Sequence, residues 1–427
     1  MIGLTLAARR LAVALLLLLT VMPGLAAEQI WPRVCEGMSL HGEAQPLVQK
    51  WRDYYSSHPR RVRSLLAPSE PWLWHIVRAI DERGFPMEIA LLPVIESNYN
   101  PNARSPGGAE GLWQFVGVTA RNHGLRETDW YDGRRDALAS TDAALDYLAN
   151  LHDLFDNWLL ALAAYNVGEN RLIAEQRKQL AAGLPRNFWK MPLPEETRGH
   201  VPRLLGLALA VCGEDMRLPE IKDTPVTDIV QLPGQIDLQV ASDWSGVPLS
   251  TLFAINPGLR YSVTDPDGPH RLLMPIRNIE KFKLRLASAD QSEFVRYARH
   301  TVASGDNLSS IAQRYGSSVG AIQRTNRLSG TLIKVGHTLM IPKGGRPAST
   351  LKAPLVASTA TSRRQKAEYV VQAGDSLSVL AQRFGVSQKE LESWNDLSRS
   401  GVLRIGRKLV IWLPQDGDIN SERSPDA

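Results

Sequence analysis

Apolar residues recur at helical spacing through much of the first half of the chain. The pattern is clearest in three segments, Ala137 to Leu154, Leu159 to Ala164 and Val201 to Val211. Apolar positions three and four residues apart form one face of a helix, which then packs into a core. We therefore expect a mainly helical domain over residues 69–219, preceded by a helical extension over residues 28–68.

One apolar run ends in an acidic residue. The run Ile89 to Ile95 follows Pro86, which suits the first turn of a helix. Ile89, Leu92 and Glu96 then fall on one helix face at i, i+3 and i+7. The negative end of the helix dipole and apolar neighbours both disfavour a charged carboxylate. Glu96 is therefore expected to hold a proton at neutral pH, and a merely half-buried glutamate at a helix end is the alternative.

The second half of the chain carries an internal repeat. Gly305-Asp306-Asn307-Leu308-Ser309 recurs as Gly374-Asp375-Ser376-Leu377-Ser378, and further matches follow in the same register. So many matches in one register indicate two copies of a small module. Its turns and apolar runs predict strand, helix, helix, strand in residues 298–343 and again in residues 368–414.

Single residues within each copy fit this order. Asp306 and Asp375 are suited to cap the first helix, and Gly316 and Gly385 are suited to close it. Residues 226–279 are interpreted as a third, degenerate copy, because they keep the apolar order but lack the Gly-Asp-x-Leu turn. Whether this third copy binds glycan is left open.

The chain between and after the copies has the composition of unstructured polypeptide. Residues 344–367 are rich in Pro, Ala, Ser and Thr, which predicts a flexible linker. Residues 415–427 are polar and predict a disordered tail. The fold class expected for the whole chain is α+β multidomain, with one mainly helical domain and small βααβ modules.

The N-terminus has the pattern of a targeting segment. Arg9 and Arg10 precede an apolar run, Leu11 to Met22, that is shorter than the ~20 residues of a membrane-spanning helix. With small residues following this run, we expect residues 1–27 to be a signal peptide and the mature protein to be exported to the periplasm. A retained signal anchor is the alternative. No cysteine directly follows the run, so a lipoprotein anchor in the outer membrane is not supported, and association with wall or membrane would be peripheral.

Composition narrows the class of protein further. Hydrophobic residues make up 44% and charged residues 22%, as in a soluble globular protein, and the formal net charge is +5. No basic stripe argues for nucleic acid, no histidine pairing supports a metal site, and no cofactor is expected. Cys35 and Cys212 would pair in an oxidising compartment, and two free thiols are the alternative.

The repeated module resembles the LysM family. The Gly-Asp-x-Leu turn and the late asparagines, Asn326 and Asn395, carry the resemblance. It implies a βααβ domain that binds N-acetylglucosamine-containing glycans such as peptidoglycan. The residues implicated in glycan binding are Gly305, Asp306 and Asn307 in one copy and Gly374, Asp375 and Ser376 in the other. For each of them a role in a cap or turn is the alternative.

The helical domain resembles lytic transglycosylases with a goose-type lysozyme-like fold. Glu96-Ser97, Ser105, Gly111-Leu112-Trp113-Gln114 and Ala164-Tyr165-Asn166-Val167-Gly168 occur in the order found in that family. The resemblance makes Glu96 the sole catalytic acid and base, oriented by Ser105 and Tyr165. It places Ser97, Trp113, Gln114 and Asn166 along the sugar subsites, Trp113 by stacking. Core packing is the alternative for the aromatic residues, and a turn is the alternative for Ser105.

One position departs from the family pattern. In the segment Leu193 to Pro202, His200 stands where the family usually has tyrosine. The departure leaves the role of this position open, or makes it dependent on pH.

The chemistry implied is cleavage of the β-1,4 bond between N-acetylmuramic acid and N-acetylglucosamine. Most glycosidases use two carboxylates, but the matching motifs contain one. The other acids considered, Asp132, Asp136 and Glu169, are assigned to caps and surface pairs. If the muramic acid's own 6-hydroxyl attacks, the product is a 1,6-anhydro ring. A hydrolytic muramidase and a non-catalytic peptidoglycan-binding scaffold are the alternatives.

Overall fold

The computed structural model describes residues 29–128, 130–342, 364–372, 377, 380, 388–395 and 406–414. The chain forms two compact units, Met1–Leu355 and Val356–Ala427. The predicted signal peptide and the predicted tail lie outside the described residues. Within the described ranges, no helix has both the length and the apolar character needed to cross a membrane.

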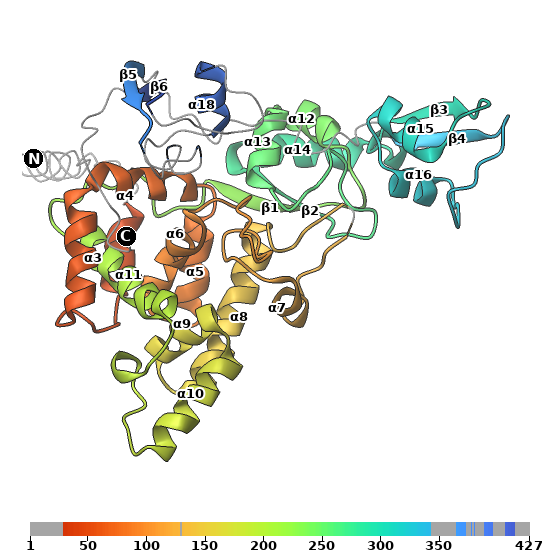
Figure 1. Ribbon diagram of the computed structural model, residues 1–427. Coiled ribbons are helices and arrows are strands. Elements are labelled where there is room, and N and C mark those ends of the chain that lie inside the picture. Colours follow the sequence, from red (N-terminus) through yellow and green to blue (C-terminus); the bar gives the residue numbers. More distant parts are fainter. Residues whose placement is uncertain are drawn as a thin grey trace, which may run out of the picture. The chain divides into compact units, whose positions relative to one another are not determined.

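The first helices share a core with the helical domain. They are α2 (Ile30–Glu36), α3 (Pro46–Ser57) and α4 (Pro59–Leu66), and the 3-10 turn η1 (Ala67–Ser69) follows. α3 lies alongside α11, the last helix of the domain (Figure 1). A Cβ on Gly206 of α11 would come within 2.4 Å of the Trp51 Cβ, so only glycine lets the two helices approach this closely. The predicted extension is therefore packed into the domain.

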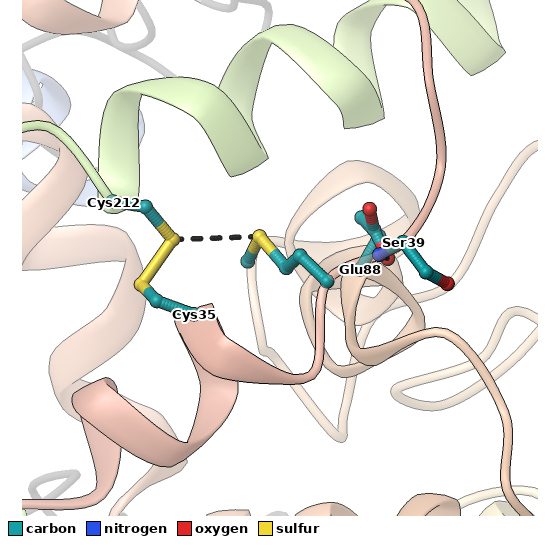
Figure 2. The surroundings of a disulfide bond; sticks show 5 residues. Cys35, Ser39, Glu88 and Cys212 are labelled. Atoms are coloured by element: carbon teal, nitrogen blue, oxygen red, sulfur yellow. Dashed lines mark hydrogen bonds between the residues drawn. A yellow bond between two sulfur atoms is a disulfide. The ribbon is translucent and has the colours of Figure 1, made fainter.

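A disulfide ties the start of this domain to its end. It joins Cys35 in α2 to Cys212, the residue that follows α11 (Figure 2). Near the bridge, the buried carboxylate of Glu88 accepts hydrogen bonds from the backbone amides of Leu40 at 2.7 Å and Ser39 at 3.3 Å. The segment between α2 and α3 is thus held at two points.

Between η1 and the end of the domain come eight helical segments and α11. They are α5 (Leu73–Glu82), η2 (Met87–Leu91), α6 (Leu92–Ser97), α7 (Gly117–Asn122), α8 (Ala137–Phe155), α9 (Trp158–Val167), α10 (Glu169–Ala181), η3 (Phe188–Lys190) and α11 (Glu195–Val211). Asp136 and Asn157 cap α8 and α9, because their side-chain oxygens accept backbone N–H groups of the first turn. α8, α9 and α11 contain the three segments predicted from apolar spacing.

The helix predicted to carry Glu96 is in two pieces, which corrects the single helix expected. η2 is a 3-10 helix, and α6 begins directly after it. Pro93 accounts for the break, because proline has no N–H to donate to the carbonyl of Ile89 one turn earlier. Ile89 and Leu92 are fully buried. α6 ends at Ser97, and the C-cap residue Asn98 has a left-handed φ of 54°.

Residues 227–288 form a βααβ module with an added helix. Its elements are β1 (Thr227–Gln231), α12 (Leu238–Ser245), α13 (Leu249–Ile255), β2 (Arg271–Pro275) and α14 (Ile276–Ser288). β1 and β2 pair antiparallel, with Val230 opposite Leu272 in the core. The order matches the one predicted for the third copy, and α14 adds a helix that was not predicted.

The first of the two clear repeats follows after a 3-10 turn, η4 (Gln291–Glu293). It consists of β3 (Tyr297–Thr301), α15 (Leu308–Tyr315), α16 (Val319–Thr325) and β4 (Thr338–Pro342), with the two strands antiparallel. Gly316 closes α15 in the left-handed conformation, as predicted. The cap of α15 is Asn307 and not Asp306, because the carboxylate of Asp306 turns back to accept the Ala303 amide at 2.8 Å.

The second unit contains β5 (Arg364–Val370), α18 (Gln388–Trp394) and β6 (Lys408–Pro414). β5 pairs antiparallel with β6 along its whole length, from Arg364 opposite Pro414 onward. Residues 364–367 therefore belong to a strand, which corrects the predicted end of the linker. The rest of the linker and the predicted glycan-binding residues Gly374, Asp375 and Ser376 lie outside the described residues, as does the predicted closing residue Gly385.

Each of the three modules has an asparagine at the equivalent position, and it makes the same three hydrogen bonds in each. In the first repeat the Asn326 side chain donates to the carbonyls of Ile322 and Met340 and accepts from the Met340 amide, all within 2.8 Å. Asn256 makes the equivalent bonds in residues 227–288, and Asn395 makes them in the second unit. This asparagine clasp joins the second helix to the last strand. The shared clasp indicates that residues 227–288 have the same fold as the repeats.

Candidate active site

The carboxylate of Glu96 meets the imidazole of His200. Oε1 of Glu96 lies 2.8 Å from Nε2 of His200, which projects from α11. The side chain of Glu96 is 13% exposed and that of His200 is 4% exposed. One carboxylate oxygen is therefore engaged by a buried ring, while the carboxylate as a whole keeps some access to solvent.

Several hydrogen bonds fix the short helix that carries Glu96. The hydroxyl of Ser97 donates to the carbonyls of Pro93 at 3.0 Å and Leu112 at 2.9 Å. From α11, the guanidinium of Arg203 lies 3.4 Å from the carbonyl of Ile95. α6 is thus tied both to the loop that follows residue 110 and to α11. The buried hydroxyl of Ser97 is occupied by these bonds, and its contact with sugar stays a prediction.

The loop over residues 111–115 is shaped by Gly111 and Gln114. A Cβ on Gly111 would lie 1.8 Å from the carbonyl oxygen of Arg134, so no other residue fits there. Gln114 adopts a left-handed φ of 51°, and its side-chain amide donates to the carbonyls of Gly111 at 2.9 Å and Ala103 at 3.3 Å. Gln114 is half-buried, so its carbonyl oxygen is a candidate for a sugar hydroxyl.

Tyr165 lies in the same region but bonds to the loop. Its hydroxyl donates to the carbonyl of Trp113 at 2.7 Å. Burial raises the pKa of Tyr165 well above its ordinary value, and the charge of Glu96 raises the pKa further, so the hydroxyl remains a neutral donor. The ring packs near Phe115 and Tyr147. Its orientation of Glu96 stays a prediction, since its described hydrogen bond fixes the loop.

The structure contradicts the stacking role given to Trp113. The residue is fully buried, and its Nε1 donates to Thr141 Oγ1 at 3.0 Å. A ring with no exposed surface cannot stack on a sugar, so Trp113 is a core residue that supports the loop from below.

The remaining predicted residues have partners of their own. Ser105 is half-buried, and its Oγ accepts the Ala109 amide at 3.0 Å, which shapes the turn before the loop. Asn166 is half-buried, and its Oδ1 accepts the Thr197 hydroxyl at 2.8 Å, which joins α9 to α11. Their proposed contacts with Glu96 and with sugar stay predictions.

The other acids considered from the sequence form ion pairs, a helix cap or a hydrogen bond with tyrosine. Asp132 pairs with Arg134 at 2.7 Å and with Arg260 at 3.0 Å. Asp136 caps α8, and Glu169 accepts the hydroxyl of Tyr147 at 2.7 Å. Among the described residues, no three of the His, Cys, Asp and Glu side chains cluster in a way that would hold a metal ion.

In the first repeat, the predicted glycan-binding residues are part of a fixed turn. Gly305 has a left-handed φ of 89°, and Oδ1 of Asn307 accepts the Ser310 amide at 2.9 Å. The carboxylate of Asp306 is 2.7 Å from His300, and the Ala303 amide and His300 hold its pKa below the ordinary value. Their side-chain acceptors are occupied, so a glycan contact there stays a prediction.

The chain matches known families along most of its length. Family models match as follows: Transglycosylase SLT domain at residues 77–183, lytic transglycosylase MltD LysM-like domain at residues 226–291, and LysM domain at residues 300–342 and 369–412. The membrane-bound lytic murein transglycosylase D of Escherichia coli K12 is 32% identical over 398 residues, covering 90% of this chain and 85% of that protein. The chain belongs to the lytic murein transglycosylase D family. The same relative from the E. coli strain O6:H1 gives the same identity and coverage.

Other similarities are narrower. An autolysin of Enterococcus faecalis is 37% identical over 112 residues, which are 26% of this chain and 15% of that protein. The solved structure of the 70 kDa soluble lytic transglycosylase SLT70 from E. coli matches at 21% identity with a TM-score of 0.29. That match covers 38% of this chain and 29% of that one. Membership in the transglycosylase D family confirms the predicted lytic transglycosylase with LysM modules.

Proposed function

We propose that this lytic transglycosylase cleaves the β-1,4 bond between N-acetylmuramic acid and N-acetylglucosamine in peptidoglycan, with Glu96 as its acid and base. The observation that carries the proposal is the placement of Glu96. It is a partly exposed carboxylate at the end of α6, inside the segment that matches the SLT domain. The other acids considered from the sequence have different partners: Asp132 pairs with Arg134, Asp136 caps α8, and Glu169 accepts the hydroxyl of Tyr147.

One carboxylate is enough if the substrate supplies the nucleophile. Protonated Glu96 donates its proton to the glycosidic oxygen as the bond from that oxygen to C1 of muramic acid breaks. The resulting carboxylate then takes the proton of the 6-hydroxyl, whose oxygen attacks C1. The bond from O6 to C1 closes a 1,6-anhydro ring, and Glu96 is protonated again. No water is consumed.

The residues around Glu96 are assigned supporting roles in this proposal. Gln114 and Asn166 are half-buried and offer amide groups to sugar hydroxyls. Ser105 and Tyr165 shape the turn and loop beside the carboxylate, which supports their role in orienting it. Ser97 acts with them by anchoring α6 to the loop.

Product analysis on purified sacculi tests the reaction. The products should end in 1,6-anhydromuramic acid, each one water lighter than the hydrolytic product, and should take up no labelled oxygen from solvent water. Reducing ends that carry solvent oxygen would instead identify a hydrolytic muramidase. Glu96→Gln keeps the shape but not the proton, so turnover should fall by about 10²–10⁴. Glu82→Gln, which removes an exposed carboxylate on α5, is the matched control and should keep full activity.

We also propose that the protein is exported to the periplasm and held on the wall by its LysM modules. The apolar N-terminal run supports export, and the Cys35–Cys212 disulfide fits an oxidising compartment. The name of the E. coli relative describes that protein as membrane-bound. Fractionation of cells that make the protein would locate it, and a cytoplasmic, fully reduced protein would contradict the proposal.

A further inference from the structure

The partner of Glu96 is a side chain that can itself carry a proton. We propose that Glu96 and His200 share one proton as a coupled pair, and that this pair, not Glu96 alone, sets the pH range of activity. His200 is then a positioning residue that acts through Glu96. The proposal rests on the proposed role of Glu96 as the acid.

The hydrogen bond fixes where the protons lie. Nε2 of His200 is 2.8 Å from Oε1 of Glu96, whereas Nδ1 is buried with no hydrogen-bond partner among the described residues. A hydrogen on Nδ1 would leave a buried donor unsatisfied, which costs about 1–3 kcal/mol. We therefore assign the neutral ring's hydrogen to Nε2, from which it is donated to Oε1. The second carboxylate oxygen is left to deliver a proton to substrate.

This arrangement allows two forms with the same number of protons. In one form His200 is neutral and Glu96 is protonated, which is the form able to act as an acid. In the other form the imidazolium faces the carboxylate, and the charge-assisted hydrogen bond between them offsets the cost of the unsatisfied N–H on Nδ1. A change of pH does not interconvert these two forms, so they titrate together with macroscopic pKa values that belong to the pair. The acid form is lost only when the pair as a whole loses its proton.

Three tyrosines in the segments around this site remain neutral. Burial raises the pKa of Tyr165 on α9, and the charge of Glu96 adds to this effect. Burial likewise raises the pKa of Tyr99, which follows α6 and donates to the carbonyl of Ala90 at 2.7 Å. On α8, the pKa of Tyr147 is raised first by burial and then by its bond to Glu169. These rings therefore do not compete for the shared proton in the working range of pH.

The charged groups on neighbouring elements are fixed. Arg203 on α11 lies against the carbonyl of Ile95. Glu88 on η2 is occupied by backbone amides near the disulfide. On α3, Arg52 and Asp53 pair with each other near the surface. Among these groups, His200 is the one hydrogen-bonded to the proposed acid, so we expect the pH profile to respond to this pair.

The pH profile of kcat/KM on a soluble glycan fragment tests the proposal. In the wild type the alkaline limb reports the pair, and in His200→Tyr it should report Glu96 alone. The limb should move to lower pH, because a carboxylic acid loses its proton at lower pH than an imidazolium does. Below the new limb the variant should gain activity relative to the wild type, because no imidazolium competes for the proton. His200→Gln, which keeps a neutral N–H donor and is less bulky, should show the same shift.

A purely structural role would give a different result. It would lower kcat at every pH and leave the limb in place, and such parallel profiles in both variants would overturn the proposal. A second measurement does not depend on activity: the NMR titration of His200 should move to lower pH in Glu96→Gln, and an unchanged titration would also overturn it. Reducing ends among the products would refute the transglycosylase mechanism but not the shared proton, so the two failures are distinguishable.

Discussion

Asn98 and Tyr99 carry the chain out of α6 in left-handed conformations, with φ of 54° and 55°. This conformation costs roughly 1–2 kcal/mol in a residue other than glycine. The contacts of Tyr99 offset the cost, because its ring is fully buried and its hydroxyl donates to the Ala90 carbonyl. The exit from α6 is therefore fixed, and Glu96 sits one turn or less from a rigid point in the backbone.

Sequence motifs located the residues of the site better than they assigned their roles. The motif segments meet at the loop that carries Gln114, because Ser97 donates to the carbonyl of Leu112 and Tyr165 donates to the carbonyl of Trp113. Trp113 was misassigned because a motif does not reveal which face of a ring the core covers. His200 was recognised only as a departure, since residues over 100 positions apart meet through the packing of α6 against α11.

The first prediction concerns Trp113. Trp113→Phe removes the hydrogen bond to Thr141 and leaves a small cavity, so the free energy of unfolding should fall by about 1–3 kcal/mol. Since the ring has no exposed surface, KM for glycan fragments should stay within a few-fold of the wild type. Urea denaturation and steady-state kinetics measure the two effects. Trp244→Phe, at a half-buried position, is the control, and a large rise in KM with unchanged stability would restore the stacking role.

At the scale of elements, apolar residues at regular helical spacing predicted α8, α9 and α11. The sequence pattern did not predict the break before α6 or the start of β5. α8 was predictable because its alanine and leucine spacing coincides with the Asp136 cap. The break before α6 follows from Pro93, which lacks an N–H to continue the helix. The apolar spacing of the run does not show this break. β5 begins before the predicted end of the linker, because residues 364–367 pair with β6. The composition of the linker does not indicate that its last residues have a strand partner.

The second prediction concerns the bridge between α2 and the end of α11. A double variant, Cys35→Ser with Cys212→Ser, should lose about 2–5 kcal/mol of unfolding free energy, because the unfolded chain is no longer closed into a long loop. Denaturation with and without reductant measures the loss, and reductant should not affect the double variant. Thiol counting of denatured, unreduced wild type should find none, whereas two free thiols would contradict the bridge.

At the scale of the molecule, the module at residues 227–288 is joined to the helical domain. The Asp132 amide donates to Gly258 at 2.8 Å, and the Arg260 amide donates to Trp130 at 2.7 Å. The side chain of Arg260 also pairs with Asp132. These contacts come from the loop between α13 and β2. Because this loop packs on the helical domain, we expect the module to support the catalytic domain and not to bind glycan.

The third prediction separates anchoring from cleavage. A chain ended after Arg296, which pairs with Asp237, keeps α14 and the core of the joined module except for Ala321 of α16. It should retain activity on soluble fragments but pellet less with sacculi, because the LysM modules supply a high effective concentration at the wall. Full-length Glu96→Gln is the control and should pellet like the wild type. Equal pelleting of the shortened and full chains would rule out the anchoring role.

The asparagine clasp also bears on how such modules diverge. Its asparagine is 17 residues from the bonded strand carbonyl in residues 227–288, 14 in the first repeat and 15 in the second unit. Because the clasp holds both ends, the intervening loop changes length without disturbing the helix or the strand. Insertions are therefore tolerated in the segment that meets a ligand or a neighbouring domain. The same clasp can thus serve in a module that binds glycan or in a module that supports a neighbouring domain, depending on the loop it encloses.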